Sequence, residues 1–258
     1  MAKACPPERG RDDRVTIVTG AAKGLGHAVA LEMAPRSAAM LLVDLDEEPL
    51  AALAKELLAR GHTVVTRVAD LTAPESAADV IALADQELGG ADVLVNNAGI
   101  VQYDGFLDTS REFLRRLLEV DVESVYFMTQ AFAASLRDRG IGGSVVNLGT
   151  GHAVTGVGGT SAYAAAKGAI HALTRALAVE LAPLGIRVNT LALGTTMTER
   201  VRTELAPELL AQRFERIPLR RGATPEEAAQ AIAYLVEAGY ATGTELVLDG
   251  GFTVFGDG

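Results

Sequence analysis

Short apolar, largely β-branched runs alternate with longer stretches rich in Ala and Leu along this chain of 258 residues. Nearly continuous apolar runs of this length are typical of parallel strands that are buried on both faces of a sheet. The longer stretches have the length of helices. The predicted strands are Val15–Thr19, Met40–Val43, Thr63–Val68, Asp92–Val95, Ser144–Leu148, Ile186–Leu191 and Leu246–Leu248, and the predicted helices lie near 25–34, 47–60, 74–88, 110–138, 160–182 and 225–237.

This alternation predicts an α/β fold, a single Rossmann-like doubly wound domain. Right-handed crossovers place helices on both faces of a parallel sheet of about seven strands. No linker, low-complexity tract or fixed repeat divides the chain, so we expect a loose leader over residues 1–13 and one domain over residues 14–258. The stretch 195–217 is rich in Arg, Glu and Thr and follows the sixth predicted strand, a position typical of a substrate lid.

Charge and cysteine content exclude several classes of partner. The formal net charge is −10, whereas a general nucleic-acid binder needs a basic face. No uninterrupted apolar run is long enough to cross a bilayer, so no membrane partner is expected. Cys5 is the only cysteine, which excludes disulfides within the chain and favours a cytoplasmic location. His27, His62, His152 and His171 lack metal-ligand spacing, so no metal site is predicted.

A glycine-rich turn follows the first predicted strand and leads directly into a helix. Glycines in such a turn let backbone N–H groups approach a pyrophosphate at the helix N-terminus. A glycine-rich turn without a ligand is the plainer alternative for this motif alone. The residues expected to contact a dinucleotide here are Gly20, Lys23, Gly24, Leu25 and Gly26.

The choice between NAD and NADP depends on Asp44, which ends the second predicted strand. A carboxylate there accepts hydrogen bonds from both ribose hydroxyls and repels a 2′-phosphate, so Asp44 favours NAD. Lys23 acts in the opposite direction, because a cation in the glycine turn could hold that phosphate. The other role open to Asp44 is that of a helix-start residue in an acidic loop.

Tyr163 and Lys167 lie four residues apart in a predicted helix, so both side chains lie on one helix face. A cation beside a tyrosine favours the phenolate and lowers the phenol pKa, which suits a proton-transfer catalyst. An ordinary contact on a helix surface is the alternative when the pair is considered alone.

These motifs, together with Asn96-Asn97-Ala98-Gly99 after the fourth predicted strand, resemble the short-chain dehydrogenase/reductase family from about Val15 to Thr253. The resemblance implies that Tyr163 is the acid/base and that Lys167 lowers its pKa and binds the nicotinamide ribose. It further implies that the cofactor is contacted by Asp70 and Leu71 at the adenine, by Asn97, Ala98 and Gly99 at its ribose, and by Gly194, Thr196 and Thr198 near the nicotinamide and phosphates.

Two residues depart from the family pattern. Thr150 stands where the family has a serine that orients the substrate oxygen; it keeps the hydroxyl but adds a methyl group, so a narrower pocket is expected. A plain strand-end residue is the alternative. Asp121 stands where an Asn helps to hold a water linked to the lysine. Its charge would stabilise protonated Lys167 and disfavour a tyrosinate at Tyr163, which leaves the net effect on the pH optimum open.

The resemblance implies reversible hydride transfer between a secondary alcohol and nicotinamide, in which Tyr163 moves the proton and Thr150 holds the oxygen. Two alternatives remain. One is a nucleotide-binding protein that senses NAD(H) with little turnover, supported only by Asp121 and Thr150. The other is a dehydratase or epimerase that retains its cofactor. The predicted substrate contacts are Gln102, Tyr103, His152, Thr195 and Met197, and they do not identify the substrate.

Lid charge and helix apolarity each leave two interpretations. Arg200, Arg202, Arg213 and Arg216 could attract an anionic substrate, although pairing with neighbouring glutamates on a surface helix is the plainer possibility. The helices 110–138 and 160–182 carry more apolar residues than one face needs. The resemblance implies that they pair in a homodimer or homotetramer, whereas burial within one chain could explain part of the pattern, which comprises Val125, Phe127, Phe132, Ile170 and Leu173.

Overall fold

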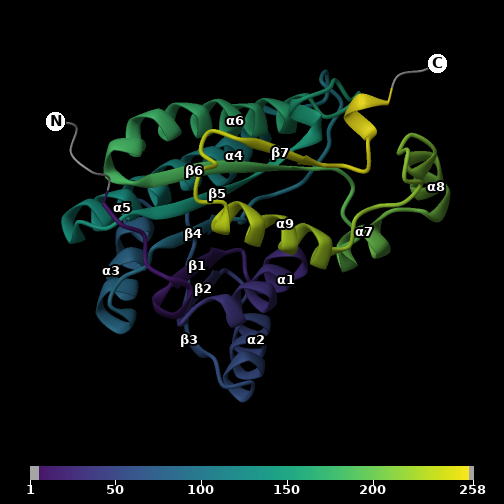
Figure 1. The fold of residues 1–258 in the computed structure, drawn as a ribbon. Helices are drawn as coiled ribbons and strands as arrows, with labels where there is room; N and C mark the ends of the chain where they lie inside the picture. Colours follow the sequence, from purple (N-terminus) through teal and green to yellow (C-terminus); the bar gives the residue numbers. More distant parts are fainter. Residues whose placement is uncertain (1–5, 256–258) are drawn as a thin grey trace.

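The computed structural model describes residues 6–255, which form one seven-stranded sheet in the order β3-β2-β1-β4-β5-β6-β7 (Figure 1). Every pairing is parallel. The chain order reverses between β1 and β4, as in a doubly wound sheet. The predicted fold is therefore confirmed. The strands are β1 Val15–Thr19, β2 Ala39–Asp44, β3 Thr63–Val68, β4 Val93–Asn96, β5 Gly143–Thr150, β6 Ile186–Leu193 and β7 Glu245–Leu248.

Helices cover both faces of the sheet (Figure 1). Successive side chains of a strand point to opposite faces, so Val18 packs with α1 and α9 whereas Ile17 packs with α3 and α5. Both faces thus carry their own apolar cluster. The helices are α1 Gly24–Met33, α2 Glu47–Ala59, α3 Ser76–Leu88, α4 Arg111–Leu118, α5 Ser124–Arg139, α6 Ser161–Leu181, α7 Glu199–Glu204, α8 Pro207–Glu215 and α9 Pro225–Glu237.

The single helix predicted over 110–138 is interrupted, and that prediction is corrected. Ser110 caps α4 by accepting a hydrogen bond from the Phe113 N–H at 3.0 Å. A π-helical turn over Glu119–Glu123 then separates α4 from α5. Such a turn holds an extra residue and is common at functional sites. It contains Asp121, whose exposed fraction is 0%.

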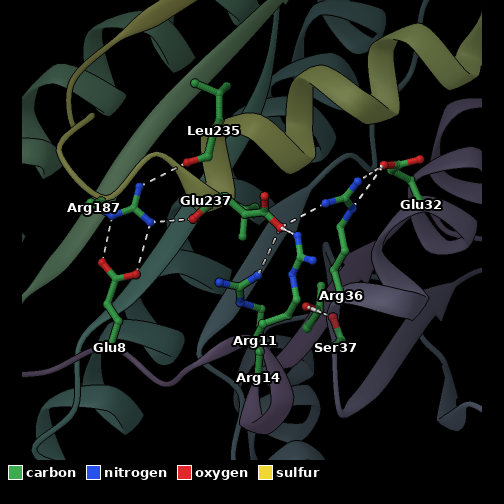
Figure 2. Close-up of polar contacts among 11 residues, drawn as sticks. Glu8, Arg11, Arg14, Glu32, Arg36, Ser37, Arg187, Leu235 and Glu237 are labelled. Carbon is green, nitrogen blue, oxygen red and sulfur yellow. Dashed lines mark hydrogen bonds and ion pairs between the residues drawn. The ribbon is translucent and has the colours of Figure 1, made fainter.

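The leader predicted to be loose is fixed from residue 6 onward, and that prediction is wrong for residues 6–13. Arg9 donates to the carbonyl oxygens of Gly89 and Gly90, and a short 3₁₀ turn spans Arg11–Asp13. Figure 2 shows Glu8 paired with Arg187 and Arg11 paired with Glu237. Cys5 lies outside the described residues.

The segment predicted as a lid carries α7 and α8 beyond the carboxyl end of β6 (Figure 1). Thr198 caps α7 by accepting from the Val201 N–H at 3.4 Å. The Ala223 N–H donates to the Thr195 carbonyl oxygen at 2.9 Å, and the Ala223 carbonyl oxygen accepts from the Met197 N–H at 2.8 Å, which anchors the start of the segment. The segment is thus held at its base by backbone hydrogen bonds, while its two short helices project from the sheet (Figure 1).

Three of the five apolar residues considered for an interface are buried within the chain itself: Val125, Phe132 and Ile170. Phe127 remains 52% exposed. Burial within one chain therefore explains much of the apolar excess on the two long helices. Within residues 6–255 no helix combines the length and apolarity needed to cross a bilayer.

Candidate active site

A cleft of about 960 Å³ opens at the carboxyl ends of the strands. All of the predicted catalytic and cofactor-binding residues line it. They come from loops after β1 to β6 and from α6, elements far apart in sequence, because the carboxyl ends of parallel strands meet at one edge of the sheet. The cleft has a nucleotide end beside the glycine turn and a substrate end beneath the lid.

At the nucleotide end, the backbone of the glycine turn packs closely against the start of α1. Gly20 has a φ of +62°, and a Cβ on Gly26 would lie 1.9 Å from the Gly20 carbonyl oxygen. The Asn97 side-chain amide donates to the carbonyl oxygens of Thr19 and Gly20, each at 2.9 Å. These contacts fix the turn with α1 beginning at Gly24, an arrangement that fits a pyrophosphate at a helix N-terminus.

Asp44 and Lys23, the two residues on which the predicted choice between NAD and NADP depends, both line the nucleotide end but are held differently. One Asp44 oxygen accepts from the Ala22 N–H at 2.8 Å and the other from the Asp46 N–H at 3.1 Å. These bonds hold the carboxylate at the end of β2, where it lines the cleft. Lys23 is 67% exposed and pairs with Asp46 at 2.8 Å. The lysine charge is therefore already compensated.

Beside Asp70 and Leu71, which are predicted to contact the adenine, the cleft contains a residue that sequence reasoning missed. Asp70 accepts from the Thr72 N–H at 2.9 Å and from its hydroxyl at 2.7 Å, and these hydrogen bonds lower the pKa of Asp70. Arg116 donates to the Thr72 hydroxyl at 3.2 Å and lines the cleft. Arg116 lies on α4, far from Asp70 in sequence, and no local motif marks it.

The catalytic candidates meet at the start of α6. Tyr163, Lys167 and Thr150 are each less than one-tenth exposed. Lys167 Nζ lies 3.1 Å from Asp121 Oδ2, and Asp121 Oδ1 accepts from the Ile100 N–H at 2.8 Å. Asp121 Oδ2 receives no aligned hydrogen bond from the described residues. The lysine and the aspartate thus form a buried ion pair beside the tyrosine.

The pKa of Tyr163 is raised. Burial is the main cause, the negative charge of Asp121 adds to it, and a hydrogen bond with Thr150 opposes it. Because Asp121 pairs with Lys167 and offsets its charge, the role of Lys167 in lowering this pKa stays a prediction. The tyrosine remains protonated well above neutral pH.

Thr150 is oriented by groups on both sides. Its hydroxyl lies 3.4 Å from the Leu193 carbonyl oxygen, and its N–H donates to His171 Nε2 at 3.3 Å. His171 Nδ1 lies 3.1 Å from Glu245, so the proton on the ring is at Nδ1. Sequence reasoning missed His171, although it lies one turn after Lys167 on the same helix face.

The substrate end is lined by three of the five predicted contacts: Tyr103, His152 and Thr195. Gln102 instead donates to Asp104 at 3.4 Å, and Met197 packs under Gly222, so neither lines the cleft and those two predictions are corrected. No group of three His, Cys, Asp or Glu residues in the described part of the chain is arranged to hold a metal ion.

Residues 20–253 match the family model described as enoyl-(acyl carrier protein) reductase. The chain is 36% identical to galactitol 2-dehydrogenase (L-tagatose-forming) from Cereibacter sphaeroides, over 95% of this chain and 96% of that protein. Its structure resembles a short-chain type dehydrogenase/reductase from Mycobacterium marinum, with a TM-score of 0.88, 33% identity and coverage of 95% and 97%. It also resembles a 7α-hydroxysteroid dehydrogenase in complex with NADH and 7-oxo glycochenodeoxycholic acid, with a TM-score of 0.89, 27% identity and coverage of 94% and 95%.

Proposed function

The chain belongs to the short-chain dehydrogenase/reductase family and is an oxidoreductase, and from this premise we propose that it interconverts a secondary alcohol and a ketone with NAD. The observation that carries the proposal is the convergence of Tyr163, Thr150 and Lys167 in the cleft that also holds the glycine turn. Relatives and structural neighbours named as alcohol or sugar dehydrogenases support the reaction class.

The residues at the nucleotide end fit a dinucleotide. The glycine turn provides the closely approaching backbone, and the buried Thr196 hydroxyl, which has no partner among the described residues, faces this cleft as a donor for a phosphate or amide. Asp44 would accept from the ribose hydroxyls and repel a 2′-phosphate, which supports NAD as the cofactor. When bound, NAD supplies the acceptor for the hydride.

The chain's own residues position the substrate and move its proton. Thr150 holds the substrate oxygen by a hydrogen bond, and Tyr163 exchanges a proton with that oxygen. Lys167, one turn after Tyr163 on the same face of α6, would hold the nicotinamide ribose. Because the pKa of Tyr163 is raised, the tyrosine is ready to donate a proton to a ketone at neutral pH, whereas alcohol oxidation should become faster as the pH rises.

Low turnover with retained nucleotide binding is the second candidate, and the Asp121–Lys167 ion pair favours it. A protonated tyrosine beside a compensated lysine is a poor base for alcohol oxidation. This candidate predicts tight NADH binding together with negligible conversion of both alcohols and ketones.

We also propose a cytoplasmic location and a homodimer or homotetramer. In this assembly the exposed faces of α5 and α6, including Phe127, would meet.

A panel of secondary alcohols and ketones, assayed with NAD and NADP in parallel through nucleotide absorbance, tests the proposed reaction. The Tyr163→Phe variant should lose at least ~100-fold in kcat, the usual contribution of a general acid/base, and still bind NADH in calorimetry. Tyr126→Phe, an exposed tyrosine on α5, is the matched control. Turnover by Tyr163→Phe within a few-fold of the parent would contradict the assignment, and product formed without net absorbance change would indicate a dehydratase or epimerase.

A further inference from the structure

The four lid arginines differ in how they are held. Arg200 donates Nε to Glu204 at 2.7 Å and Nη2 to the Val101 carbonyl oxygen at 2.6 Å. Its charge is therefore compensated by a neighbour on the same helix, as expected for a surface ion pair.

Arg202 and Arg216 are also occupied. Arg202 donates to the Met197 carbonyl oxygen at 3.2 Å, and the Arg216 guanidinium lies 5.5 Å from the centre of the Phe252 ring. Neither of them lines the cleft. The structural role of these side chains is thus explained without a ligand.

Arg213, near the end of α8, is different. It lines the cleft, and within residues 6–255 no hydrogen bond, ion pair or ring contact holds its guanidinium. A guanidinium carries five donors in a planar fork that matches a carboxylate. An arginine that faces a cleft without a protein partner has this entire fork available to a ligand.

The surroundings of Arg213 form a defined pocket end. The rings of Tyr103, His152 and Tyr163 contact one another, with centroid separations of 5.6 Å between the tyrosines and 6.2 Å between His152 and Tyr163. His152 Nδ1 is buried and has no partner among the described residues. Burial and the positive charge of Arg213 both lower the pKa of His152. The ring is therefore neutral and offers a second uncommitted polar atom beside the first.

Charge at this end of the cleft contrasts with the rest of the molecule, whose formal net charge is −10. Two carboxylates that line the cleft near the substrate end, Asp121 and Glu204, are paired with Lys167 and Arg200. Burial raises the pKa of Tyr103 to about 12, and the positive charge of Arg213 acts in the opposite direction. The Arg213 guanidinium thus supplies a positive charge, unpaired among the described residues, that acts on Tyr103 and His152, and the rings of these two residues contact Tyr163.

We propose that Arg213 and His152 bind a carboxylate of the substrate, so that the substrate class is a secondary alcohol that carries a carboxylate, or its oxo counterpart. This inference rests on the proposed function and adds the substrate class to it. Arg213 would take the carboxylate through its fork, His152 Nδ1 would complete the contact, and the hydroxyl carbon would lie between this anchor and Tyr163.

Matched pairs of 2- and 3-hydroxy acids and their methyl esters test the inference. The parent should convert an acid with a kcat/KM at least ~10-fold above that of its ester, because a charge-assisted hydrogen bond is lost in the ester. Arg213→Gln should lower kcat/KM for the acid by ~10-fold or more, mainly through KM, and leave the ester unchanged. Arg213→Lys, which keeps the charge without the fork, should recover part of the loss.

Arg216→Gln is the matched control, because it removes the same charge from the same lid outside the cleft. Equal conversion of acids and esters by the parent, or equal losses in Arg213→Gln and Arg216→Gln, would overturn the inference while leaving the proposed reaction intact. Calorimetric titration of the unreactive acid 2-methylpropanoate, with and without NADH, gives a separate readout. Binding that is weakened by Arg213→Gln supports the carboxylate site even without turnover, whereas the absence of NADH binding and of turnover contradicts the proposed function itself.

Discussion

Buried charge gathers in two regions of this molecule, and the two regions treat it differently. At the C-terminal end of α9, Arg187 donates to Glu8 at 2.8 Å and to the Leu235 carbonyl oxygen at 3.1 Å (Figure 2). It also donates to the carbonyl oxygens of Val236 at 2.7 Å and of Ala238 at 3.1 Å. In the cleft, Asp121 and Lys167 lie 3.1 Å apart without an aligned hydrogen bond to Asp121 Oδ2. Each side-chain nitrogen of Arg187 has a hydrogen-bond partner, whereas the cleft leaves donors and acceptors open.

Complete satisfaction is what stability requires, because a buried charge without partners costs several kcal/mol. Arg187 also binds the last carbonyl groups of α9, which have no partner inside the helix. Three groups of the cleft have no partner among the described residues and can form hydrogen bonds with a ligand: Thr196 Oγ1, His152 Nδ1 and the Arg213 guanidinium. Buried polar groups without a partner also occur away from the cleft, at Arg14, Ser76, Arg139 and Ser144; those in the cleft differ because a ligand can reach them.

Removal of Arg187 should have the largest effect on stability among the substitutions that test this contrast. Arg187→Met should lower the free energy of unfolding by about 3–5 kcal/mol, because Glu8 and several helix-end carbonyl groups lose their partner. The urea midpoint measures this loss, and kcat of the remaining folded enzyme should be unchanged. Arg137→Met, at an exposed pair with Asp138, is the control and should shift stability by about 0.5 kcal/mol or less. Similar urea midpoints for Arg187→Met and Arg137→Met would show that the buried contacts of Arg187 contribute no more to stability than an exposed ion pair does.

Asp121→Asn sharpens the contrast at the other region. The negative charge of Asp121 raises the pKa of Tyr163, so its removal should lower that pKa and move the rise of the alcohol oxidation rate to lower pH by about one unit, or ~1.4 kcal/mol. The amide oxygen still accepts from the Ile100 N–H, so the fold should persist. The pH–rate profile of oxidation is the measurement.

Glu123→Gln removes the same charge from the same π-helical turn at an exposed position and should leave the profile in place. If the Asp121→Asn profile superimposes on that of the parent, Asp121 does not control the proton transfer.

Glu237→Gln tests the satisfied region by pH. A hydrogen bond from Arg11 lowers the pKa of Glu237 below its ordinary value of 4.5; burial opposes this, and Arg36 contributes in the same direction as Arg11. A lowered folded-state pKa gives stability that is present above the unfolded pKa and lost as the pH falls through the folded value. The difference in stability between parent and variant should therefore be present at pH ~7, at about 1 kcal/mol or less because the side chain is partly exposed, and disappear in acid. Thermal unfolding at both pH values measures it; a difference that grows in acid would contradict the sign.

The regular parts of the fold were predictable from the sequence. Continuous apolar runs specify buried parallel strands wherever they occur, and the glycine turn, Asp44 and the Tyr163/Lys167 spacing each lie within a short local pattern. The π-helical turn was not predicted, because a search for a periodicity of 3.6 residues does not detect one extra residue in a turn. The contacts that fix the N-terminal segment were not predicted, because Glu8 and Arg187 are far apart in sequence and lie together only in the folded chain.

The sequence by itself therefore determined the succession of strands along the chain, the glycine turn before α1 and the placement of Tyr163 and Lys167 on one helix, since each depends on neighbours within a few residues. Only the tertiary structure decided the electrostatic state of that pair, because Asp121 reaches Lys167 across a chain separation that no spacing rule covers. It likewise singled out Arg213 among four similar arginines, because the freedom of a guanidinium depends on which partners the folded chain brings to it.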